Sequence, residues 1–161
     1  MSIVNKRPLH HYFFAGLSVI WLIAVAGYCG PKAYSAWRQT HWIATTGNMK
    51  TLAMSVEEYR EATKHCPDAR NIIDLEGKLV PKYLARMIRA DQWGHDYRYE
   101  YWTDRAGLEH CALGSAGGDG IWERSSLKEY PEGLPETRPE NFNADAVIID
   151  NEWRQRPINI H

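Results

Sequence analysis

The stretch DQWGHDYRYEY, residues 91–101, decides the fold of this chain, because a Trp-Gly pair precedes three tyrosines that alternate with other residues. Side chains on a β-strand point alternately to opposite faces, so the tyrosines share one face of an extended strand. A glycine lets the backbone bend sharply just before that strand. We therefore interpret Trp93, Gly94, Tyr97 and Tyr99 as a structural corner and the strand that follows it, rather than as a binding site.

Downstream of this strand, a second short alternating run covers residues 108–113, and the intervening TDRAG has the composition of a turn. These two runs predict an antiparallel β-hairpin. Near the end of the chain, the β-branched run at residues 146–149 and the Asp150-Asn151 pair predict a last strand and a short return.

Upstream of the corner, residues 31–65 predict a long amphipathic helix. Apolar side chains recur there at steps of three and four residues, with charged side chains between them that we expect to face water. The stripe consists of Met49, Leu52, Ala53, Val56 and Tyr59, and the charged set of Lys50, Glu57, Glu58 and Arg60. Pro67 predicts that the helix ends near His65. We interpret residues 68–78 as a connector and expect one helical turn to begin at Pro81.

The N-terminal segment is apolar, with no charged side chain between Arg7 and Lys32. Residues 12–30 are long enough for a transmembrane helix. Lys6, Arg7 and an A-x-A pattern at residues 24–26 are also compatible with a cleaved signal peptide. Because the apolar run continues past the A-x-A pattern into a helical one, we favour an uncleaved anchor.

The remaining composition fits one domain with one modest core, since the chain has 161 residues and 44% of them are hydrophobic. Acidic and basic residues are mixed and the formal net charge is -1, so no basic face for nucleic acid is predicted. Cys66 and Cys111 fit a disulfide in an oxidising compartment, although two such cysteines also occur as unrelated buried thiols. Cys29 lies at the edge of the apolar segment.

Candidate chemistry gathers at the glycine loop of residues 114–120, GSAGGDG. The loop matches neither a phosphate-binding P-loop nor a G-x-S-x-G nucleophile elbow. A hydrolase hypothesis would use Ser115 or Cys111 as nucleophile, but no oriented base accompanies either residue, and we predict no catalytic residue. Asp119 and Asp145 offer hard oxygen ligands of the kind calcium uses, without EF-hand spacing.

In order along the chain, these pieces resemble the periplasmic domain of the major pseudopilin of bacterial type II secretion systems. MKTLAMSVEEYR at residues 49–60 resembles its amphipathic helix, and residues 79–99 resemble the segment that leads into its D-P-W-G-x-P-Y-x-Y motif. Ser115, Gly117, Asp119 and Gly120 match its S-x-G-x-D-G loop, and Asp145 its later acidic position. The resemblance covers roughly residues 45–155.

This resemblance implies a domain that is not an enzyme, in which a helix packs on a small antiparallel sheet and the glycine loop binds calcium through Asp119 and Asp145. Two features depart from the family. Gln92 and Asp96 stand where its corner has prolines, so we expect Trp93 packing and hairpin pairing to make the corner rigid. No acidic residue precedes Glu57, whereas pseudopilins carry a glutamate in the apolar helix.

The predicted fold is α+β: an N-terminal transmembrane helix continues into a long amphipathic helix that packs on a small antiparallel sheet, as in pilins. Four segments are expected: a cytoplasmic segment (1–11), a transmembrane helix (12–30), the long helix (31–65) and a pseudopilin-like periplasmic region (66–161) with a Pro-rich loop (129–142).

The predicted function is that of a non-enzymatic subunit, anchored once in the inner membrane, whose periplasmic domain contacts other membrane-protein subunits in a secretion or energy-transducing complex. We expect contacts with the lipid bilayer, no nucleic acid, no small-molecule substrate, and no cofactor other than calcium. The alternative is a genuine pseudopilin of a secretion filament with an unusual leader.

Overall fold

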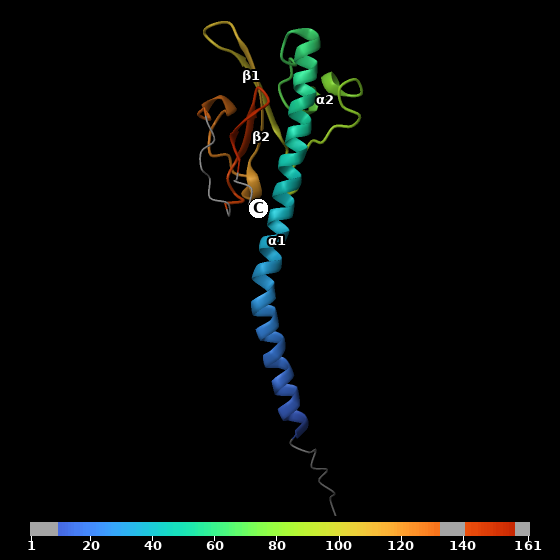
Figure 1. The fold of residues 1–161 in the computed structure, drawn as a ribbon, viewed down its shortest axis with the longest axis vertical. Coiled ribbons are helices and arrows are strands. Elements are labelled where there is room, and N and C mark those ends of the chain that lie inside the picture. Colours follow the sequence, from blue (N-terminus) through green and yellow to red (C-terminus); the bar gives the residue numbers. More distant parts are fainter. Residues whose placement is uncertain (1–9, 133–140, 157–161) are drawn as a thin grey trace, which may run out of the picture. The chain divides into compact units, whose positions relative to one another are not determined.

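The computed structural model describes residues 10–132 and 141–156, with side chains from residue 27 onward (Figure 1). The chain divides into two compact units, Met1–Arg38 and Gln39–His161. The described part of the first unit is helical and belongs to α1, which spans His10–Thr63. Its side chains from residue 27 to residue 37 are exposed.

Within the part of the chain that the structure describes, no helix combines the length and the apolar character needed to cross a membrane. Most of the span predicted at residues 12–30 falls on residues whose side chains lie outside that description, as does the whole of the predicted segment 1–11.

In the second unit, the C-terminal half of α1 buries the predicted stripe. Met49, Leu52, Ala53 and Val56 are buried, whereas Tyr59 is half-buried. The prediction that the charged set faces water was right for Glu58 and wrong for the other three members, which are half-buried. These three lie against the turn that follows β3, where Lys50 Nζ donates to the Asn151 carbonyl at 2.9 Å and an Arg60 guanidinium nitrogen to Asp150 at 2.8 Å.

The segment after α1 holds a helix that the sequence reading missed. α2 spans Ile72–Leu79, in the stretch interpreted as a connector, and its buried residues are Ile72, Leu75 and Leu79. The Asn71 side chain caps it by accepting hydrogen bonds from the amides of Ile73 and Asp74, both at 2.9 Å. The expected helical turn at Pro81 was wrong, since residues 80–83 form a hydrogen-bonded turn after the end of α2, in which the Tyr83 amide donates to the Leu79 carbonyl at 2.8 Å.

The sheet is four-stranded and antiparallel, in the order β1-β2-β3-β4. Its strands are β1 (Arg98–Thr103), β2 (Glu109–Ser115), β3 (Ala146–Ile149) and β4 (Glu152–Gln155). The predicted hairpin is confirmed as β1 and β2, with Tyr99 opposite Leu113. The predicted last strand and its return are β3 and β4, and both Asp150 and Asn151 have positive φ at the turn between them. Two short 3-10 helices, η1 (Gly117–Asp119) and η2 (Leu127–Glu129), follow β2.

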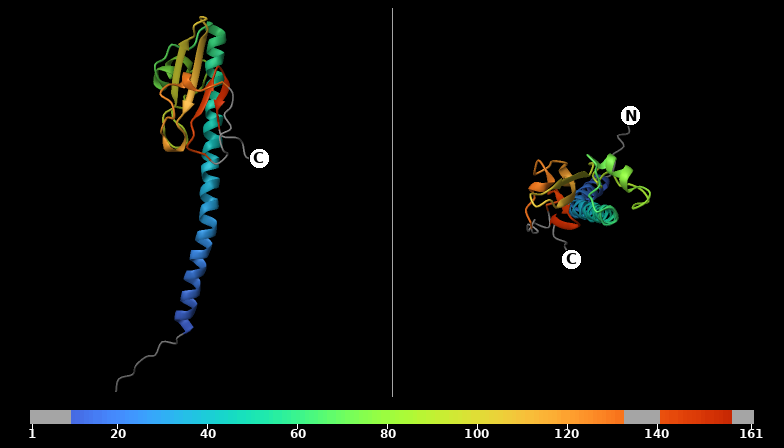
Figure 2. Two further views of the ribbon diagram at one scale, coloured as in Figure 1. Left: turned by 90° about the vertical axis from the view of Figure 1, so that its left-hand side faces the viewer. Right: turned by 90° about the horizontal axis from the view of Figure 1, so that it is seen from above.

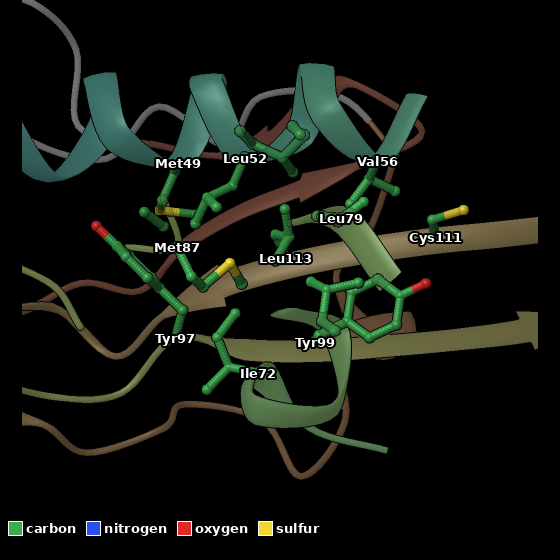
Figure 3. Close-up of a cluster of buried hydrophobic side chains, with 14 of the residues drawn as sticks. Met49, Leu52, Val56, Ile72, Leu79, Met87, Tyr97, Tyr99, Cys111 and Leu113 are labelled. Atoms are coloured by element: carbon green, nitrogen blue, oxygen red, sulfur yellow. The ribbon is translucent and has the colours of Figure 1, made fainter. Parts of the chain in front are cut away.

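The sheet packs along the C-terminal half of α1 (Figure 2) and separates two groups of buried side chains. On the helix side, Met49, Leu52 and Val56 of α1 meet Tyr99 and Leu113 of the hairpin (Figure 3). The opposite side holds a smaller cluster of Ala112, Leu127, Tyr130, Val147 and Ile149. This arrangement establishes the α+β class, with one long helix on a small antiparallel sheet.

The Pro-rich loop predicted at residues 129–142 is described only at its two ends, since residues 133–140 lie outside the description. Its first part belongs to η2 and Tyr130, and its last residue is Phe142. Tyr130 and Phe142 are buried, with exposed fractions of 4% and 8%. Both aromatic rings therefore pack inside the domain at the two ends of the loop.

Candidate cation site at the glycine loop

The corner at residues 91–95 is organised by one buried carboxylate. Asp91 Oδ1 accepts hydrogen bonds from the amides of Trp93 at 3.0 Å and His95 at 2.9 Å. Gly94 has φ of 90°, a value that favours glycine. Asp91 is the residue that sequence reasoning missed here, although an aspartate whose side chain binds the amide two residues later is typical of a turn.

Aromatic side chains connect this corner to α1 and to the segment that follows it. The Trp93 ring lies 5.3 Å from the Trp42 ring of α1, centroid to centroid. Of the two tyrosines assigned to the corner, Tyr97 donates from its hydroxyl to the Thr45 carbonyl at 3.3 Å and Tyr99 to the Pro67 carbonyl at 2.8 Å. Both tyrosines are buried, so the corner anchors the sheet to α1 and does not present an aromatic surface.

The same carboxylate connects the corner to the glycine loop. Ser115 at the end of β2 is buried, and its hydroxyl donates to Asp91 Oδ2 at 2.7 Å. The Ser115 oxygen also accepts a hydrogen bond from the Gly117 amide at 3.3 Å. Cys111, the other residue considered as a nucleophile, forms a disulfide with Cys66, with their Cα atoms 5.8 Å apart. In this structure neither side chain is an accessible nucleophile.

The glycine loop packs directly on the segment that precedes β3. Gly117 has φ of 66°, and a Cβ atom at this position would lie 2.5 Å from the Ala144 carbonyl oxygen. The Gly118 amide donates to the Phe142 carbonyl at 2.7 Å. Because a side chain at Gly117 would collide with the Ala144 carbonyl, Gly117 lets the loop that carries Asp119 approach the segment that carries Asp145.

Asp145 is buried and incompletely paired. Its Oδ2 atom accepts hydrogen bonds from the Glu123 amide at 2.8 Å and from the Tyr130 hydroxyl. Its Oδ1 atom is buried and has no hydrogen-bond partner among the described residues. A buried carboxylate oxygen without a partner is costly, so Asp145 Oδ1 is the strongest candidate at this loop for contact with a cation.

Neighbouring negative charges add to this cost. Burial raises the pKa of Asp145, and the carboxylates of Glu123 and Asp119 raise it further, against the hydrogen bond from Tyr130. Burial, together with Asp145, also raises the pKa of the Tyr130 hydroxyl, so this phenol remains a donor. Glu123 and Tyr130 are site residues that sequence reasoning missed, because each meets Asp145 only through the packing of separate loops.

These oxygen atoms suit a hard divalent cation, which carboxylates, backbone carbonyls and water oxygens coordinate together. Asp119 is exposed, and its Oδ1 atom accepts a hydrogen bond from the Ile121 amide at 3.0 Å. Among the described residues, no three histidine, cysteine or acidic side chains converge closely enough to form a metal centre by themselves. Asp145 is therefore the carboxylate that the fold already holds in place for a cation. Any further ligands would be the Asp119 carboxylate, backbone carbonyls or water.

Comparisons with protein-family models, with curated proteins and with solved structures found no match to this chain.

Proposed function

We propose that this chain is a non-enzymatic subunit of a bacterial membrane complex, anchored by its apolar N-terminal segment and making protein contacts through a pilin-like domain. The observation that carries the proposal is the packing of the C-terminal half of α1 on a four-stranded antiparallel sheet. The corner at residues 91–95 and the glycine loop occur in it in the order that the resemblance to pseudopilins implies.

The proposed location is the inner membrane, with the domain in the periplasm. The apolar run from residue 12 to residue 29 supports the anchor. The disulfide between Cys66 and Cys111 supports an oxidising compartment for the domain. Protease added to spheroplasts should digest the domain, and alkaline carbonate should leave the intact chain in the membrane. A chain that carbonate extracts, or that protease cannot reach, contradicts this location.

A second candidate function is that of a genuine pseudopilin in a secretion filament. The observation in its favour is the continuity of α1, which runs through Pro31 without interruption, as the stalk helix of a filament subunit requires. The mass of the mature N-terminus separates the two proposals. An intact Met1 favours the accessory subunit, whereas cleavage by a prepilin peptidase followed by methylation favours the filament.

We further propose that Asp145 and Asp119 bind calcium beside the glycine loop, with backbone carbonyl and water oxygens as the remaining ligands. When bound, calcium would neutralise the buried Asp145 carboxylate, whose Oδ1 atom has no partner among the described residues. Millimolar calcium should stabilise the full-length chain by about 1 to 3 kcal/mol relative to a chelator, since a ligand of the folded state raises its stability by mass action.

The variant Asp145→Asn provides the sharp test of this calcium site. It removes a buried charge, so in chelator it should be at least as stable as the wild type, while its melting temperature should no longer respond to calcium. Asp104→Asn, at an exposed turn, is the matched control and should keep the calcium response. Equal responses of wild type and Asp145→Asn would contradict the site.

A further inference from the structure

Two turns of the sheet meet at the imidazole of His110, at the opposite end of β2 from the glycine loop. One is the β1–β2 turn, residues 104–108, and the other is the β3–β4 turn, residues 150–151. His110 Nδ1 lies 2.6 Å from Asp150 Oδ2, and His110 Nε2 lies 3.5 Å from Asp104 Oδ2. The imidazole therefore stands between two carboxylates, one from each turn.

Each of these carboxylates is held in place through its second oxygen atom. Asp104 Oδ1 accepts hydrogen bonds from two amides of its own turn, both at 2.8 Å. Asp150 Oδ1 accepts hydrogen bonds from the Cys111 amide at 3.1 Å and from the Arg60 guanidinium at 2.8 Å. Because backbone amides orient both carboxylates, neither turns away from His110 while the turns keep their shape.

The His110 ring is held from its flat side as well. It stacks on the Trp102 ring of β1, with the centroids 5.4 Å apart. The charged groups that face it are the two carboxylates, and α1 contributes Arg60, which is paired with both Asp150 and Glu57. The hydrogen bond to Asp150 raises the pKa of His110 above 6.5, against the opposing effect of burial.

Contact with a carboxylate on each side requires two N–H donors. Both ring nitrogens donate only in the charged imidazolium, whereas a neutral imidazole has one donor and one acceptor. The shorter contact retains the proton in the neutral ring, so Nδ1 still donates to Asp150. The lone pair of Nε2 then faces Asp104 Oδ2, and the charge attraction on that side is lost. Loss of one proton therefore separates His110 from Asp104 and leaves the contact with Asp150.

The β1–β2 turn is the part that this change would free. Apart from the contact with His110, the hydrogen bonds of residues 104–108 that involve described residues are internal to the turn. Gly107 and Leu108 of this turn form one wall of a groove of about 550 Å³, and the C-terminal end of α1 forms another. Leu108 has an exposed fraction of 61%. The shape of the groove thus depends on where the turn is held.

We propose that His110 is a pH-dependent latch, whose protonated ring holds the β1–β2 turn to the β3–β4 turn and whose deprotonation releases the β1–β2 turn and alters the groove. The latch is closed below the pKa of His110 in the folded chain and open above it. It depends on neither the proposed subunit role nor calcium, because it involves only groups within this end of the sheet.

The test is backbone hydrogen exchange, measured by NMR on the full-length chain in detergent micelles at about pH 6 and about pH 9. Each rate is divided by the intrinsic rate at that pH, which gives a protection factor. The Ala106 and Leu108 amides, which donate to Asp104, should lose protection about fivefold or more at the higher pH. The Asp150 amide, which donates to the Cys111 carbonyl at 2.9 Å, is the internal reference and should keep its protection.

Two variants distinguish a latch from a contact that is only structural. His110→Gln does not titrate, so protection of its turn should be the same at both pH values. In Asp104→Asn the amide group can donate to the neutral Nε2 atom, so at pH 9 the turn should keep the protection that the wild type has at pH 6.

The proposal is overturned if protection of the wild-type turn does not change with pH, or if the turn of Asp104→Asn loses protection as the wild type does. A pH-dependent turn in His110→Gln would overturn it too. The chemical shifts of the His110 ring should titrate with the same midpoint as the protection of the turn. This wild-type measurement, together with Asp104→Asn, decides the matter even if His110→Gln does not fold.

Discussion

Two buried aspartates, Asp91 and Asp145, have opposite surroundings. Asp91 accepts hydrogen bonds from two backbone amides and from the Ser115 hydroxyl, so donors surround its charge. Asp145 has one oxygen atom without a partner among the described residues, and carboxylates lie nearby. The same residue type therefore has a structural role in the corner and is, in our proposal, a calcium ligand beside the glycine loop.

Replacing Asp91 by alanine should destabilise the fold strongly. The change leaves the Ser115 hydroxyl and the Trp93 and His95 amides without their acceptor, which corresponds to about 2 to 4 kcal/mol in the free energy of unfolding. Urea denaturation of the full-length chain measures this loss. The exposed Asp96→Ala is the control and should stay within about 0.5 kcal/mol of the wild type. Similar losses in the two variants would show that Asp91 does not organise the corner.

His110 should make the stability of the domain depend on pH. Its Nδ1 atom lies 2.6 Å from Asp150 Oδ2, and this hydrogen bond raises the pKa of His110 above its usual 6.5. A raised pKa stabilises the fold fully below the unfolded value, and this contribution is lost as pH rises through the folded pKa. The advantage of the wild type over His110→Gln in melting temperature should therefore be larger at about pH 6 than at about pH 9. A difference that does not change with pH would contradict the pairing.

At the scale of elements, local patterns predicted the hairpin and the long helix but not α2. The alternation in β1 and β2 and the stripe on α1 are read from neighbouring residues, and the structure confirms both. α2 is short, but two sequence features indicated it: Asn71 is a typical helix cap, and apolar residues recur at helical spacing, at Ile72, Leu75 and Leu79. The polar residues between them obscured this pattern. The half-burial of Lys50 and Arg60 was not readable, because their partners lie about a hundred residues away in the chain.

The disulfide joins the segment that follows α1 to β2, across a sequence separation of 45 residues. Closing a loop of that length restricts the unfolded chain and stabilises the fold by about 4 kcal/mol in the chain-entropy description. The double variant Cys66→Ser with Cys111→Ser should lose stability of that order in thermal or urea denaturation. Cys29→Ser, which removes an exposed free thiol, is the control and should unfold like the wild type. Equal stability of both variants would show that the bridge contributes little to the fold.

At the scale of the whole molecule, the sequence predicted the α+β class, and it placed Asp119 and Asp145 as candidate ligands through resemblance to a family. It could not predict that Glu123 and Tyr130 surround Asp145, since three separate loops must pack before these side chains meet. Helices and strands can be predicted from the pattern of neighbouring residues, whereas functional sites depend on contacts between residues far apart in the sequence.

The measurement that tests the central claim most directly is native mass spectrometry of the full-length chain, purified in mild detergent from the membranes that produce it. A subunit of a larger complex should co-purify with partner proteins in a fixed ratio and keep its Met1. A chain that runs only as a free monomer, with no partner at any detergent concentration that preserves other complexes, would contradict the account.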